Sequence, residues 1–182
     1  MCAGASHPAA RRRLPGMTEQ LVDVPAAEAQ LVFEPIPAAL LRQTRTAMTD
    51  EAGNLLTVQV DAAGGSPLRC CLRETRPGEE VLLIAYTPPG TAGAYAERGP
   101  VFIHARPCAG YPTPGQYPAG LRHRQQVVRA YDDQGRIADG ILVPDGDHAL
   151  PVIRELLARP GVRLVHLRNV GYGCYNFAVR PA

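Results

Sequence analysis

The sequence contains no lysine, and all 19 of its basic residues are arginines. This absence excludes Schiff-base chemistry on a lysine and, with it, a lysine-anchored pyridoxal phosphate. No stretch approaches the roughly 18 consecutive apolar residues of a membrane-spanning helix. Residues 1–16 lack the apolar core of a signal peptide, so we expect a cytoplasmic protein with reduced thiols. Dinucleotide-binding, Gly-x-Ser-x-Gly and His-Glu-x-x-His motifs are also missing.

Length and charge favour one domain that binds neither nucleic acid nor membrane. The 182 residues are enough to bury a sizeable core. The formal net charge is +2, but Arg11, Arg12 and Arg13 lie together near the N-terminus, and without them the 17 acids slightly outnumber the arginines. We interpret residues 1–16 as a disordered N-terminal extension, with Met17 as an alternative start. Residues 17–182 are then a single globular domain.

Glycine and proline, with 18 residues each, favour many short elements. The patterns predict helices over 38–47 and 148–158, and strands over 31–34, 55–60, 81–86, 101–105, 126–131, 136–143, 162–169 and 174–179. Hairpin turns over 132–135 and 170–173 favour antiparallel pairing. We therefore expect a single-domain α+β fold with one mainly antiparallel, twisted or barrel-like sheet of about seven strands and two helices.

Cysteine and histidine residues offer a candidate zinc site. His104 lies in a predicted buried strand and Cys108 follows four residues later, and zinc accepts both ligand types at such spacing. Neighbours in a strand point to opposite faces, so we expect only one of the adjacent Cys70 and Cys71 to contribute. The candidate metal set is Cys71, His104, Cys108 and Cys174. The alternatives are a cysteine–histidine nucleophile pair and simple burial of the thiols.

A polar pocket for a small anionic ligand is the second candidate. Arg129 and Arg168 lie within predicted strands, where an inward-facing guanidinium needs a carboxylate or an anionic ligand. Glu97 is one of the acids that could pair with them, and the alternative is a solvated sheet face. The candidate pocket consists of Tyr95, Glu97, His104, Arg129, Arg168 and Asn169.

Several of these residues lie in distinctive motifs, namely Pro77-Gly-Glu79, 82–86, 95–105 with Cys108, 129–132, and Arg168-Asn169 with 173–177. In these motifs the chain resembles a bacterial family of uncharacterised proteins, the domain of unknown function number 1203. The resemblance implies a small cytosolic domain whose activity is unassigned. It also implies that the shared motifs include Tyr95, Glu97, His104, Cys108, Arg129, Arg168 and Cys174.

One segment departs from that family. The family often has Cys-x-x-Cys-Leu where this sequence has Leu68-Arg-Cys-Cys-Leu72. Leu68 stands at the position of the first cysteine, which argues against a metal or redox role for this segment.

Three hypotheses follow from the sequence. The first is a small-molecule or anion-binding domain with a polar pocket near His104, and an enzyme is included in this class. The second is a zinc-binding protein that uses cysteine and histidine ligands. The third is a structural or interaction protein without a catalytic site, which would show an exposed apolar patch in place of a polar pocket.

Overall fold

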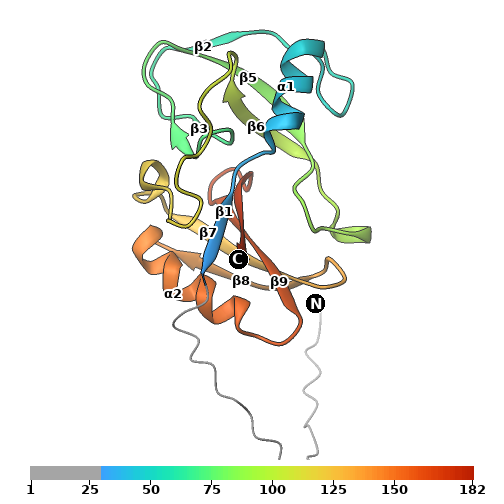
Figure 1. The fold of residues 1–182 in the computed structure, drawn as a ribbon, viewed down its shortest axis with the longest axis vertical. Coiled ribbons are helices and arrows are strands. Elements are labelled where there is room, and N and C mark those ends of the chain that lie inside the picture. The colour runs from blue at the N-terminus through green and yellow to red at the C-terminus, as the bar shows by residue number, and fades with distance from the viewer. Residues whose placement is uncertain (1–29) are drawn as a thin grey trace, which may run out of the picture.

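The computed structural model describes residues 30–182. The predictions made for residues 1–16 and for Met17 lie outside this part of the chain. The described residues form three layers, with one helix and two sheets stacked on one another (Figure 1).

Each sheet has five strands. The terminal sheet, named for the first and last strands that it contains, has the order β1 (Leu31–Glu34), β10 (Tyr175–Pro181), β9 (Val162–Asn169), β7 (Gln126–Asp132) and β8 (Ile137–Val143). The inserted sheet lies between β1 and β7 in the sequence and has the order β2 (Gln59–Asp61), β5 (Glu79–Tyr86), β6 (Gly99–His104), β3 (Pro67–Leu68) and β4 (Arg73–Glu74). All pairings are antiparallel except that of β3 with β6.

Two α-helices accompany the sheets. Helix α1 (Ala38–Ala47) follows β1, and α2 (Gly146–Leu157) connects β8 to β9. The side chain of Asp145 accepts a hydrogen bond from the His148 backbone N–H and so caps α2. Single-turn helices occur at Gly93–Tyr95 and Ala119–Leu121. No helix among residues 30–182 is long and apolar enough to cross a membrane.

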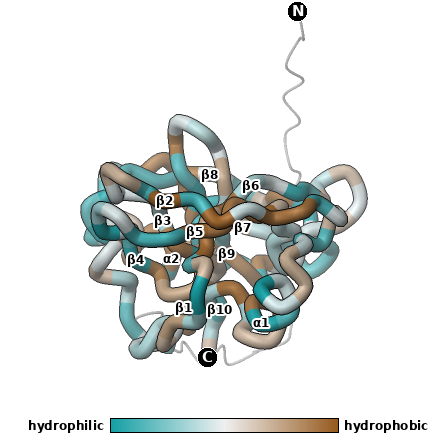
Figure 2. Tube along the Cα trace, turned by 90° about the horizontal axis from the view of Figure 1, so that it is seen from above, coloured by the Kyte–Doolittle hydropathy of each residue, from teal (hydrophilic) through white to brown (hydrophobic). Residues whose placement is uncertain are grey.

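The core has two parts, one on each face of the terminal sheet. Helix α2 packs against one face, where Ile153 and Leu156 meet Val165 and Leu167 of β9. The inserted sheet packs against the other face, where Leu82 and Ile103 join the same cluster as Leu164. Figure 2 shows β5 lying across β7 and β9 in this arrangement. Because β9 is covered on both faces, its polar side chains have to find partners inside the protein.

The structure confirms the two helices and the predominance of antiparallel pairing, but the predicted single sheet of about seven strands differs from what is found. Ten strands form two open sheets, and neither closes into a barrel within the described residues. The difference arises largely in the inserted sheet, where β3 and β4 have two residues each. Such short strands are too brief to show the alternation by which a strand is recognised in a sequence.

Candidate metal centre

A tight turn places Cys70 and Cys71 on the same side of the chain. The turn follows β3, and the Leu72 backbone N–H donates to the Leu68 carbonyl at 2.9 Å. Leu72 has a φ of 55°, a left-handed conformation that is uncommon for residues other than glycine. The side-chain alternation of a strand does not apply in such a turn, and the two sulfur atoms lie 3.9 Å apart.

Pairing of β3 with β6 brings His104 to these cysteines. Leu68 is the register partner of Phe102, and the Arg69 backbone N–H donates to the Phe102 carbonyl at 2.9 Å. The turn after β3 therefore lies beside the end of β6, where His104 Nδ1 is 3.4 Å from Cys70 Sγ and 3.7 Å from Cys71 Sγ.

Cys108 completes the group from the loop that follows β6. One ligand atom from each of Cys70, Cys71, His104 and Cys108 lies within 4.8 Å of all the others. Cys70 is buried, Cys71 and His104 are half-buried, and Cys108 is exposed. The four residues therefore form a compact group that is open to solvent on the Cys108 side.

The spacing within this group matches a tetrahedral zinc site. Bond lengths of about 2.3 Å to sulfur and 2.0 Å to nitrogen place tetrahedral sulfurs about 3.8 Å apart, and sulfur and nitrogen about 3.5 Å apart. The observed separations are 3.9 Å for Cys70 and Cys71, and 3.4 Å and 3.7 Å from these sulfurs to His104 Nδ1. Cys70, Cys71 and His104 are thus spaced as ligands of one ion would be, and the Cys108 sulfur lies within 4.8 Å of each of their ligand atoms.

The surroundings of His104 keep its imidazole neutral, as a metal ligand must be. Burial and the positive charge of Arg73 lower the pKa of His104. Arg73 Nη2 lies 2.9 Å from His104 Nε2, and Glu79 Oε2 lies 3.7 Å from the same atom. Arginine can only donate, so Nε2 is the acceptor in the contact with Arg73 and Nδ1 carries the proton. A metal ion at Nδ1 would move this proton to Nε2, where Glu79 would have to replace Arg73 as the hydrogen-bond partner.

Glu79 is itself fixed as an anion. Arg73 donates to both carboxylate oxygens at 2.8 Å. This pairing lowers the pKa of Glu79 to about 2. His104 therefore lies beside an ion pair in which Arg73, 2.9 Å from Nε2, is nearer than Glu79 at 3.7 Å.

The cysteines of the group differ in acidity. The contact between Cys70 and Cys71 raises the pKa of Cys70, with burial acting in the same direction, and lowers the pKa of Cys71. Burial also raises the pKa of Cys108. Cys71 is therefore the thiol of this group that loses its proton most readily.

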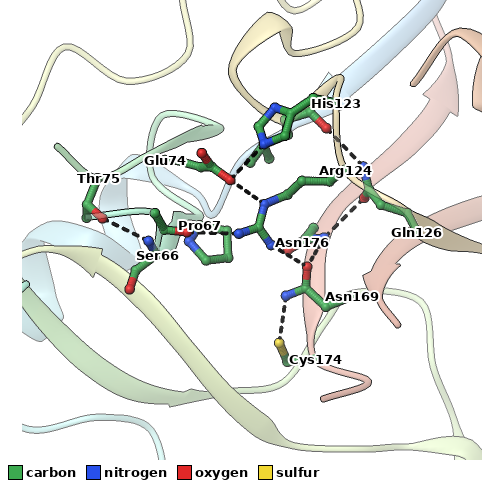
Figure 3. A network of polar contacts seen from close by, with 12 residues as sticks. Ser66, Pro67, Glu74, Thr75, His123, Arg124, Gln126, Asn169, Cys174 and Asn176 are labelled. Carbon is green, nitrogen blue, oxygen red and sulfur yellow. Dashed lines mark hydrogen bonds and ion pairs between the residues drawn. The ribbon is translucent and has the colours of Figure 1, made fainter. Parts of the chain in front are cut away.

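Cys174 lies in a different environment. Its sulfur accepts hydrogen bonds from Asn169 Nδ2 at 2.9 Å and from Arg69 Nη2 at 3.2 Å. Figure 3 shows Asn169 between Cys174 and Arg124, with Arg124 in turn bound to Glu74. This polar network supplies two side-chain nitrogen donors to the sulfur, whereas Cys70 Sγ accepts a hydrogen bond from a backbone N–H, that of His104 at 3.3 Å.

Arg69 is the unusual member of that network. Its side chain is almost fully buried, with 1% of the residue exposed. It donates to the carbonyls of Pro67 and Tyr175, and burial lowers its pKa to about 10. Within residues 30–182 it has no carboxylate at ion-pair distance, so the Cys174 sulfur is its only side-chain acceptor.

A third polar cluster lies between the sheets. Glu97 accepts hydrogen bonds from Arg168 Nη1 and, at 3.5 Å, from Arg129 Nη1. His166, on the same face of β9 as Arg168, is completely buried, with Nε2 3.0 Å from the Pro89 carbonyl. Burial lowers the pKa of His166 to about 3, so it is neutral at physiological pH.

Comparison with known families places the chain. A model of the family described as "Protein of unknown function (DUF1203)" matches residues 65–180, which is well over half of the sequence. The chain belongs to the DUF1203 family. No curated protein and no solved structure matches the chain. The matched region of this DUF1203 protein includes all four residues of the Cys/His group and both polar clusters.

The residues of the two candidate sites are redistributed in the structure. The metal group contains Cys71, His104 and Cys108 as expected, together with Cys70, whereas Cys174 lies with Arg69 and Asn169. Of the predicted pocket residues, Glu97 contacts both Arg129 and Arg168. Tyr95 lies two residues before Glu97 in the sequence and is exposed. His104 and Asn169 belong to the Cys/His group and to the Cys174 network respectively.

The sequence contained one signal for Cys70. The segment Leu68–Leu72 has no β-branched residue, which disfavours a strand and is compatible with a turn. Only one of the two adjacent cysteines was expected to bind the ion because neighbours in a strand point to opposite faces, and this alternation does not apply in a turn.

Proposed function

We propose that this DUF1203 protein is a zinc-binding protein in which Cys70, Cys71, His104 and Cys108 hold one ion. The observation that carries the proposal is the convergence of four soft ligand atoms within 4.8 Å from a turn, a strand end and a loop. Three thiolates and an imidazole suit zinc, whereas calcium and magnesium prefer oxygen ligands. Four protein ligands complete a tetrahedron, which is typical of a structural site.

The ion would connect two segments that are far apart in the sequence. Cys70 and Cys71 lie in the turn after β3, and Cys108 lies in the proline-rich loop after β6. A metal bridge between them restrains this loop, which contains little regular secondary structure of its own. Binding of the ion therefore contributes directly to folding free energy.

The third cluster is less suited to a free anion. Glu97 already supplies a carboxylate to both Arg129 and Arg168, so the arginines have a partner within the protein. This supports a role as an internal ion-pair network between the sheets.

Metal analysis tests the proposal. The full chain is refolded or purified with excess zinc, freed of unbound metal by gel filtration, and measured by elemental analysis. We expect about one equivalent of zinc in the wild type and in Cys174→Ser, and less than about a tenth of an equivalent in His104→Ala. Wild-type protein that retains less than about a tenth of an equivalent of zinc would overturn the proposal.

Cobalt provides a spectroscopic control. Cobalt(II) bound by three thiolates and one imidazole gives intense visible absorption that is characteristic of tetrahedral geometry. We expect this absorption in the wild type and in Cys174→Ser, and its loss when zinc is added in competition. Absorption that depends on Cys174 in place of Cys70 would contradict the ligand set.

A further inference from the structure

A groove lies next to the candidate metal centre, between α1 and the loop after β6. Its volume is about 750 Å³, within the range of about 300–1,000 Å³ that is usual for small-molecule sites. Its lining includes Leu41, Arg42 and Arg45 of α1, Tyr86 of β5, and the proposed ligands Cys70 and Cys108. The groove therefore reaches two of the four proposed metal ligands.

Arg45 is the polar group that this groove leaves unsatisfied. Its Nε donates to the His104 carbonyl at 3.0 Å, which fixes the guanidinium beside the end of β6. Its Nη2 is buried and has no hydrogen-bond partner among the described residues. Buried donors are almost always paired. Arg45 lines the groove, so a turn of its guanidinium toward the groove would offer the unpaired Nη2 to an acceptor from outside the chain.

The charges around the groove favour an anion as that acceptor. Within the described part of the chain, neither Arg42 nor Arg45 has a carboxylate at ion-pair distance. Glu34 is the acidic residue on the lining, and it pairs with Arg180 at 3.2 Å. The groove thus has two arginines without an ion-pair partner and a carboxylate that is already engaged.

The remaining walls are apolar or aromatic. Ile36, Leu41, Tyr86 and Tyr175 line the groove, and the rings of the two tyrosines lie 5.6 Å apart between centroids. Such a surface suits the hydrocarbon or aromatic body of a ligand, while a few polar groups fix its orientation. The chemistry of the groove therefore matches a molecule with an apolar body and one anionic end.

We infer that this groove binds a small organic oxyanion, a carboxylate or a phosphate monoester, whose charged end is hydrogen-bonded by Arg45. The ligand lies beside Cys108, the exposed member of the Cys/His group. The inference deepens the proposed function by naming a ligand class next to the metal, and it rests on that function only for the presence of the ion.

Calorimetric titration of the zinc-loaded full chain with three phenyl compounds tests the inference. Benzoate and phenyl phosphate present the two oxyanions on the same ring, and benzamide is the uncharged control. We expect saturable binding of at least one oxyanion and at least about tenfold weaker binding of benzamide, because a hydrogen bond between charged groups is replaced by a neutral one. The stronger of the two oxyanions identifies the ligand chemistry.

Variants localise the binding. Arg45→Met is expected to weaken oxyanion binding at least about tenfold, and Arg45→Lys to retain part of it. Arg163→Met is the matched control, because Arg163 is exposed on β9 and does not line the groove. Equal affinity of Arg45→Met and wild type, equal binding of benzamide and the oxyanions, or no saturable binding by the folded wild type overturns the inference.

The measurements distinguish failure of the oxyanion proposal from failure of the zinc proposal. Zinc content is measured on each titrated sample. Bound zinc without oxyanion binding removes the inference and leaves the metal site, whereas Arg45-dependent oxyanion binding to protein without zinc supports the groove and removes the proposed metal function.

Discussion

The described cysteines lie in two environments that differ in what faces the sulfur. In the Cys/His group, the sulfurs of Cys70 and Cys71 face one another and the imidazole of His104. Cys174, in contrast, faces the N–H groups of Arg69 and Asn169. Cys70 also accepts a hydrogen bond from the His104 backbone N–H, but the donor that faces Cys174 from Arg69 is charged. Ionised sulfurs that face one another repel unless a cation lies between them, whereas a sulfur beside a guanidinium already has a cation supplied by the protein. The surrounding groups, more than the residue type, therefore determine which cysteines can attract a metal.

Zinc-dependent stability should separate the two environments most strongly. Zinc at about 1,000 times its dissociation constant stabilises the native state by about 4 kcal/mol, and raises Tm by roughly 8–16 °C for a chain of this size. We expect this shift in the wild type and in Cys174→Ser. Thermal unfolding with zinc and with a chelator measures it, and a His104→Ala protein that keeps the full shift would contradict the assignment.

Replacement of single cysteines tests the difference between the two environments through the affinity for zinc. Cys108→Ser should weaken zinc binding by more than about 100-fold, the upper limit for loss of a residue that only hydrogen-bonds to a ligand. Cys174→Ser should leave the affinity unchanged. Competition against a chromophoric chelator gives both affinities, and equal losses in the two variants would show that the environments are not distinct.

The stability of the protein should depend on a hydrogen-bond acceptor at the position of the Cys174 sulfur. Cys174→Ala leaves donors of Arg69 and Asn169 without their sulfur acceptor, and we expect a loss of about 2 kcal/mol in the free energy of unfolding. Cys174→Ser preserves an acceptor and should cost less. Denaturant unfolding of both variants measures the difference, and an alanine variant as stable as the serine variant would remove the role of the sulfur.

The smallest effect concerns the partner of His104. Glu79→Gln removes the negative charge near the imidazole and leaves Arg73 unpaired there, and we expect about tenfold weaker zinc binding, as for loss of other groups that contact a metal-binding histidine. Glu80→Gln is the matched control, because Glu80 pairs with Arg106 at the surface. Metal competition under identical conditions compares them, and equal affinities would show that Glu79 does not support the ligand.

Much of the terminal sheet and both helices could be predicted because their signals are local. The apolar stretch of β9 and the sequence of α1 between Pro37 and Met48 gave the bounds that the structure shows. Inward-facing arginines in β7 and β9 were expected to need a carboxylate or an anionic ligand, and Glu97 pairs with both Arg129 and Arg168. The bounds of an element follow from the spacing of its apolar residues along the sequence, and the need for a partner follows from the free-energy cost of burying an unpaired charge.

The Cys/His group could be predicted only in part because its assembly is nonlocal. The spacing of His104 and Cys108 is visible in the sequence, but the choice of Cys70 over Cys174 depends on a parallel pair of strands and a left-handed Leu72. Neither feature has a distinctive sequence pattern, since β3 has two residues and leucine rarely adopts that conformation. The unpaired nitrogen of Arg45 likewise depends on how α1 packs beside β6.

The strand order of the two sheets has a consequence for synthesis on the ribosome. All strands of the inserted sheet lie between residues 59 and 104, and Cys108 follows immediately. Strand β1, in contrast, pairs with β10, at the other end of the described chain. All four residues of the Cys/His group are therefore translated before β7, whereas the core that the inserted sheet shares with β7, β9 and β10 can form only after translation of the last strand.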